Sequence, residues 1–143
     1  MKTPDQRLRL LAEDTEDLTV LSTILQDAVV AVGDLAYERR ARRFVAVFSR
    51  YRWERGERQR VRAGLTLRGV LAAQLRGIDR RRPADALELL AIRSTDAAGG
   101  DAAILLEFAG GSSIRLTVEC IDAELRDLGE PWGAAHHPRH ALD

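Results

Sequence analysis

The segment from residue 43 to residue 67 constrains the fold most strongly, because its second half alternates at every second position. Residues 61, 63, 65 and 67 are apolar, whereas residues 60, 62, 66 and 68 are three arginines and a threonine. A period of two is typical of a half-buried antiparallel strand. Because the charged stretch 54–58 separates this run from strand-like residues 43–53, the segment predicts a β-hairpin with one core face and one cationic face.

On the first strand of this hairpin, Arg50 and Arg52 alternate with Tyr51 and Trp53. If the arginines face water, the two aromatic side chains lie over the core or its rim. We therefore expect one cationic face that both strands share. The arginines expected on this face are Arg50, Arg52, Arg60 and Arg62.

The charges of the chain are distributed unevenly, although 22 basic and 22 acidic residues sum to a net charge of zero. Residues 1–37 have a net charge of −4, residues 38–82 of +11 and residues 83–143 of −7. Two interpretations are open. The charges can pair between neighbouring strands of the fold, or the basic middle can form a cationic face for an anionic partner.

The length and composition predict a single domain in the cytoplasm. A chain of 143 residues with 45% hydrophobic residues can bury its own core. Cys120 is the single cysteine, so the chain cannot form an intramolecular disulfide. The first residues lack the apolar run of a signal peptide, and no apolar stretch reaches eighteen residues. We expect no membrane-spanning segment.

The remaining elements follow from local patterns. Residues 7–12 predict an edge strand, and residues 15–28 predict a helix with Asp14 as its N-cap. At Gly69 the alternation changes register, which indicates a bend in a continuing strand. Further strands are expected at residues 35–38, 87–92, 102–108 and 113–120, and a short helix at residues 121–128, ending at Gly129.

These elements predict one α+β domain over residues 1–132, followed by a flexible tail at 133–143. Six or seven antiparallel strands would curl into a sandwich or a partly closed barrel, with one helix near the N-terminus and a short C-terminal helix. The alternative is a pleckstrin-homology-like barrel, which also closes with a C-terminal helix. In either fold, Trp132 would anchor the beginning of the tail.

The sequence predicts neither a cofactor nor a metal site. All three histidines, His136, His137 and His140, lie in the tail. A general acid or base in the body of the domain would therefore be a carboxylate. Cys120 has the inward phase of its strand, which favours a small buried hydrophobe over a nucleophile. We predict a non-enzymatic binding or interaction module, with an enzyme that uses carboxylates or Cys120 as the alternative.

Two kinds of partner are considered for the basic segment. A phosphate backbone would select such a cationic surface without reading sequence, so weak nucleic-acid binding is one alternative. The basic middle of one subunit could instead face the acidic ends of another in a homodimer. The candidate anion-binding residues are Arg50, Arg52, Arg60, Arg62, Arg80, Arg81 and Arg82.

Four short strings resemble a family of short bacterial proteins known as domain-of-unknown-function family 2948. The strings are Arg50-Tyr51-Arg52-Trp53-Glu54, Arg76-Gly77-Ile78-Asp79, Val118-Glu119-Cys120-Ile121 and Leu128-Gly129-Glu130-Pro131-Trp132. The resemblance covers nearly the whole chain. It implies no catalytic residues, so the function has to be inferred from the residues themselves.

Overall fold

The computed structural model describes residues 7–52, 59–96 and 102–133. Within them the chain forms nine strands, one α-helix and a short 3-10 turn. The elements are β1 (Arg9–Ala12), α1 (Thr15–Ile24), β2 (Val29–Glu38), β3 (Arg43–Tyr51), β4 (Gln59–Arg68), β5 (Val70–Arg76), β6 (Ala86–Asp96), β7 (Ala102–Phe108), the 3-10 turn (Ala109–Gly111), β8 (Ser113–Val118) and β9 (Ala123–Gly133).

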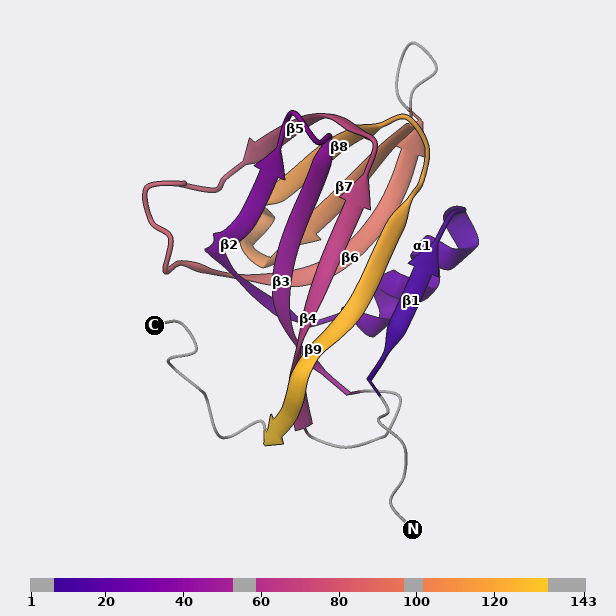
Figure 1. The fold of residues 1–143 in the computed structure, drawn as a ribbon. Helices are drawn as coiled ribbons and strands as arrows, with labels where there is room; N and C mark the ends of the chain where they lie inside the picture. The colour runs from indigo at the N-terminus through magenta and orange to yellow at the C-terminus, as the bar shows by residue number, and fades with distance from the viewer. Residues whose placement is uncertain (1–6, 53–58, 97–101, 134–143) are drawn as a thin grey trace.

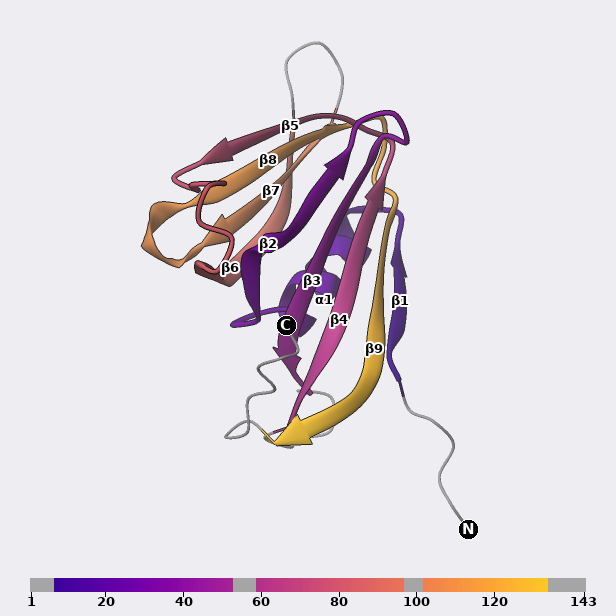
Figure 2. The ribbon, with the colours of Figure 1, turned by 60° about the vertical axis from the view of Figure 1, so that its left-hand side comes forward.

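All strands pair antiparallel in one sheet with the order β1-β9-β4-β3-β2-β6-β7-β8-β5. The sheet is open, with β1 and β5 as its edges. Figures 1 and 2 show that it folds over on itself into two layers, with β9, β4, β3 and β2 in one and β6, β7, β8 and β5 in the other. The predicted antiparallel arrangement is confirmed, and the sheet is not closed.

The core lies between these two layers. On β3, Phe44 and Phe48 are buried, and Leu106 of β7 and Leu116 of β8 are buried in the opposite layer. Val61, Ala63, Leu65 and Leu67 of β4 are all buried. The alternation in residues 61–67 therefore predicted this strand and its core face correctly.

The predicted helix near the N-terminus is present as α1 but ends at Ile24 rather than at residue 28, and Asp27, which has a φ of +66°, lies between it and β2. The Asp14 carboxylate caps it by accepting a 2.8 Å hydrogen bond from the Asp17 N–H. Leu18 and Leu21 are buried in the core. The Ile92 N–H of β6 donates to Ser22 Oγ at 2.9 Å, which fixes the helix to the sheet.

The predicted bend at Gly69 is also present. Gly69 has a φ of +70°, a conformation that L side chains rarely adopt. The chain leaves β4 there and, instead of continuing the same layer as we expected, enters β5 in the other layer and pairs with β8. The Val70 N–H donates to the Arg42 carbonyl at 2.9 Å and fixes the corner.

Two fold predictions are wrong. The structure has nine strands rather than six or seven, and residues 123–133 form strand β9 in place of a short helix at 121–128. Ala123, Leu125 and Asp127 of β9 are buried, so this segment also has a period of two, and pairing with β4 and β1 decides in favour of the strand. The pleckstrin-homology-like alternative lacks its closing helix through residue 133.

The boundary of the domain at residue 132 stays a prediction, because residues 134–143 of the expected tail lie outside the described part of the chain. The three tail histidines lie there too. Trp132 pairs with Arg60 through the backbone of β9. In the ranges that the structure describes, no helix is long and apolar enough to cross a membrane.

Candidate functional site

Arg50 does not lie on a wet face, as the sequence predicted, but is fully buried. Its Nε and Nη2 donate to the two carboxylate oxygens of Asp127 on β9, at 3.0 and 2.9 Å, and its Nη1 donates to the Tyr51 carbonyl. Asp127 is buried as well. Arg50 has the same phase as Phe44 and Phe48 on β3, so the two phenylalanines that fill the core also direct Arg50 inward.

The inward phase of Arg50 also determines on which face the neighbouring hairpin side chains lie. Arg52 is also buried, and its Nη1 donates to Gln59 Oε1 at 3.0 Å. Tyr51 lies on the outer face, where the Arg60 guanidinium stacks over its ring at 4.0 Å. The expected phases of Arg50, Arg52 and Tyr51 are therefore wrong, whereas Arg60 and Arg62 do alternate with the buried residues of β4. Trp53 lies outside the described residues.

The structure does not bring the seven candidate arginines together. Arg81 and Arg82 lie in the loop after β5, where Arg81 contacts Asp79 at 3.1 Å and Arg82 contacts Asp85 at 3.3 Å. Arg80 of the same loop lines a cleft between β2 and β5. Anion binding by the exposed members of the set stays a prediction, but Arg50 has no exposed surface with which to take part.

Several charges of the basic middle pair with the acidic last third of the chain. Arg42 contacts Glu119 at 3.6 Å, and Arg68 contacts Asp122 at 3.5 Å and Glu124 at 2.9 Å. The interpretation that the charges pair within the fold is therefore correct for these residues and for Arg50. The homodimer stays a prediction.

Glu124 is the centre of one such cluster. It is buried on β9, where it accepts hydrogen bonds from Arg68 Nη2 at 2.9 Å and Arg9 Nε at 2.8 Å. Bonds from these two guanidinium groups stabilise the carboxylate and lower the pKa of Glu124 from 4.5 to about 2, against the opposing effect of desolvation. The hydrogen bond that Arg68 donates to Glu124 also raises the pKa of Arg68.

This depressed pKa predicts a dependence of stability on pH. Because the folded protein holds Glu124 ionised below the unfolded pKa of 4.5, its contribution is complete above about pH 5 and is lost as the pH falls toward 2. The Glu124→Gln variant should lose about 1 kcal/mol at neutral pH. Urea unfolding at several pH values should show the stability difference between the two proteins shrinking as the pH falls from about 5 toward 2. A constant difference at all pH values would contradict this assignment.

Cys120 is exposed, so its predicted inward phase is wrong. Strand β8 ends at Val118, and the alternation on which the prediction rested ends with it. An enzyme that uses Cys120 or carboxylates stays an alternative without a further observation in its favour. Among the side chains that the structure describes, no three of the histidine, cysteine, aspartate and glutamate residues gather into a metal-binding group.

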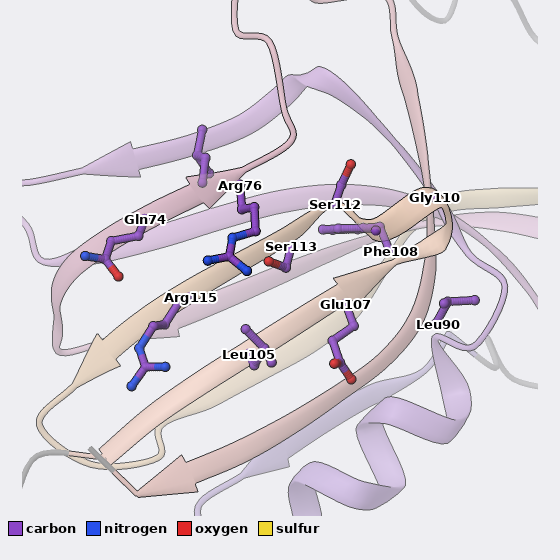
Figure 3. Close-up of a pocket in the computed structure, with 12 residues that line it drawn as sticks. Gln74, Arg76, Leu90, Leu105, Glu107, Phe108, Gly110, Ser112, Ser113 and Arg115 are labelled. Carbon is purple, nitrogen blue, oxygen red and sulfur yellow. The ribbon is translucent and has the colours of Figure 1, made fainter. Parts of the chain in front are cut away.

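A hollow on the outer face of β5, β8 and β7 brings together residues that the sequence did not single out (Figure 3). It has a volume of about 1060 Å³ and continues around the turn between β7 and β8. Gln74 and Arg76 of β5 lie beside Arg115 and Ser113 of β8, and Leu105 and Glu107 follow on β7. Figure 3 shows these six side chains projecting from the same face of the sheet.

Two cations in this hollow, Arg76 and Arg115, are unpaired within the described part of the chain. Arg76 is opposite Ser113 and Arg115 is opposite Gln74, so the two arginines are diagonal neighbours on paired strands. Neither guanidinium has a hydrogen-bond or ion-pair partner within the ranges described. Glu107 does not neutralise them, because Arg93 of β6 binds both of its carboxylate oxygens, at 3.1 and 3.2 Å. The hydrogen bonds from Arg93 lower the pKa of Glu107.

Only part of this site could be predicted from the sequence. The pattern of residues 113–118 places Arg115 on the wet face, and that assignment is correct. Its proximity to Arg76 depends on the pairing of β5 with β8, which are separated by two intervening strands along the chain. No local pattern specifies that pairing.

Comparison with known proteins places the chain in a family without a known activity. The model of the family described as "Protein of unknown function (DUF2948)" matches residues 8–140. No curated protein and no solved structure matches the chain.

Proposed function

The chain belongs to this family of proteins of unknown function, and we propose that it is a non-enzymatic binding module that holds a small multivalent oxyanion at Arg76 and Arg115. The ligand would carry phosphate or carboxylate groups. The observation that supports this proposal is the pair of guanidinium groups in the hollow of β5, β8 and β7 that have no partner among the described residues.

The geometry of the pair suits an anion with two charged groups. Diagonal cross-strand neighbours are separated by about 7 Å, so two long arginine side chains can reach one ligand between them. Each planar guanidinium can donate two parallel hydrogen bonds to a phosphate or a carboxylate. Two unpaired like charges in this relation repel one another, and a bound dianion would remove that repulsion.

The other residues of the hollow favour recognition over catalysis. Ser113 and Gln74 are polar groups beside the two arginines and can add neutral hydrogen bonds to a ligand. Leu105 and Leu90 supply apolar contacts. Glu107 is the single carboxylate among the lining residues, and Arg93 already occupies its two oxygens. Ligand pockets in proteins commonly combine apolar walls with a few charged groups in this way.

A second arginine pair in the chain provides a matched control. Arg62 of β4 and Arg126 of β9 are also diagonal neighbours on paired strands. Arg62 belongs to the basic hairpin, but neither residue lines the hollow. The two pairs therefore have the same charge and are both diagonal neighbours, and they differ in the surface on which they lie.

Calorimetric titration with pyrophosphate tests the proposal. The Arg76→Gln/Arg115→Gln variant should bind pyrophosphate at least about tenfold more weakly than the unmodified protein, because it loses two charged hydrogen-bonding groups. The Arg62→Gln/Arg126→Gln variant should retain the original affinity. Equal weakening in both variants would show a general effect of net charge and would contradict the assignment. Loss of pyrophosphate binding in the Arg62→Gln/Arg126→Gln variant alone would place the anion site on the basic hairpin instead.

A further inference from the structure

We propose that the cleft between β2 and β5 is a second binding site, which takes an amphipathic anion with an acyl or aromatic body and one acidic head group. The cleft has a volume of about 870 Å³. It is formed where the two layers fail to close: beyond Ala31, β2 pairs with β3 alone within the described chain, and β5 pairs with β8 alone. Figure 2 shows β2 and β5 as neighbouring edges of the two layers.

The inner face of β5 is apolar but incompletely covered. Leu71 and Leu75 both line the cleft, and each is 38% exposed. On the neighbouring strand β8, Ile114 and Leu116 are fully buried. The opposite wall of the cleft is formed by Leu35, Tyr37 and Phe44. Large apolar side chains thus line both walls of a concave site, exposed on β5 and partly or fully buried on the opposite wall, which favours a ligand with an apolar body.

Contacts close the cleft at both ends. At one end, the Tyr37 hydroxyl donates to the Val70 carbonyl at 2.9 Å, and at the other, the Gly33 N–H donates to the Pro83 carbonyl at 2.9 Å. A peptide strand that ran through the cleft would have to break one of these contacts. A small molecule that enters from the open side would not, so the occupant is a compact ligand.

Two arginines that line the cleft favour a negatively charged ligand. Arg39, which follows β2, and Arg80, in the loop after β5, both line the cleft. Both are exposed, and neither side chain has a polar partner among the residues that the structure places. The residues lining the cleft include no carboxylate. Arg39 is close in sequence to Tyr37 at one end and Arg80 to Pro83 at the other, so a ligand whose apolar body lies between the leucines would place its acidic head at one of these guanidinium groups.

Binding of alkanoates and of their uncharged analogues tests this inference. Titrations below the micelle concentration should show that decanoate binds about tenfold more tightly than octanoate, because two more methylene groups enter the cleft. Decanoate should bind about tenfold more tightly than decanol, which has the same apolar body without the charge. The Arg39→Gln/Arg80→Gln variant should lose the preference for decanoate and retain decanol binding. Leu71→Gln should weaken both ligands.

Two further variants locate the binding. Leu128 has an exposure of 40% on β9 and does not line the cleft, so Leu128→Gln should leave decanoate binding unchanged. Arg76→Gln/Arg115→Gln should also leave it unchanged, which separates this site from the pyrophosphate site. Equal affinity for decanoate and decanol in the unmodified protein would overturn the inference. Decanoate binding that survives both Leu71→Gln and Arg39→Gln/Arg80→Gln would overturn it as well.

Discussion

Replacing Asp127 with alanine should lower the free energy of unfolding by about 3–5 kcal/mol, because it leaves the Arg50 guanidinium charged and without its carboxylate in the interior. The side chains of Arg50 and Asp127 are 0% and 2% exposed. Asp127 also accepts a 2.9 Å hydrogen bond from the Leu8 N–H, next to β1. The substitution therefore weakens both the buried ion pair and the attachment of the N-terminal edge. Denaturant unfolding monitored by circular dichroism measures the loss.

The double variant Arg50→Met/Asp127→Leu is the informative control. Two apolar side chains of similar size remove both charges at once, and buried ion pairs replaced in this way often lose little or no stability. We expect the double variant to be more stable than Asp127→Ala alone. A loss below about 1 kcal/mol in Asp127→Ala would be typical of a solvent-exposed pair and would contradict the burial of Arg50.

Truncating Leu21 to alanine should cost about 2–5 kcal/mol, because its side chain fills the core beneath α1 and leaves a cavity when removed. Leu21 is 1% exposed, whereas its neighbour Val20 on the same helix is 51% exposed. Val20→Ala should change stability by less than about 0.5 kcal/mol. Thermal and denaturant unfolding of the two variants compare them directly. Similar losses at both positions would contradict the packing of α1 against the sheet.

The elements that the sequence predicted correctly rest on local signals. The alternation of residues 61–67 identifies β4 and its buried face, and Asp14 identifies the start of α1. Gly69 identifies the corner between β4 and β5, because a positive φ favours glycine whatever the fold. Each of these features is decided by residues that are close together in the chain.

The incorrect predictions depend on contacts between distant residues. On β3, both faces contain apolar residues, so alternation alone does not determine the phase. The prediction put Arg50 on the solvent-exposed face because it is charged. In the structure, Arg50 shares the inward face of β3 with the buried phenylalanines and binds the carboxylate of Asp127 on β9, 77 positions away. β9 itself is a strand because β4 and β1 lie on either side of it. Local sequence patterns do not predict which distant strands and side chains pair.

The candidate site shows the same division. The alternation of β8 is enough to place Arg115 on the solvent-exposed face, but the site requires Arg76 on a strand that comes far earlier in the chain. The sequence analysis placed the anion-binding surface on the basic hairpin because the arginines there are close together in the sequence. In the fold, Asp127 binds Arg50 and Glu124 binds Arg68, so much of that charge is already neutralised.

The central claim, that Arg76 and Arg115 form an anion-binding site, is tested most directly by mapping pyrophosphate on the folded protein with amide chemical shifts. We predict saturable shifts at Arg76, Ser113 and Arg115, with one common dissociation constant, and unchanged amides at residues 60–62 of the hairpin. Saturable shifts confined to residues 60–62, or none at all on β5 and β8, would contradict it.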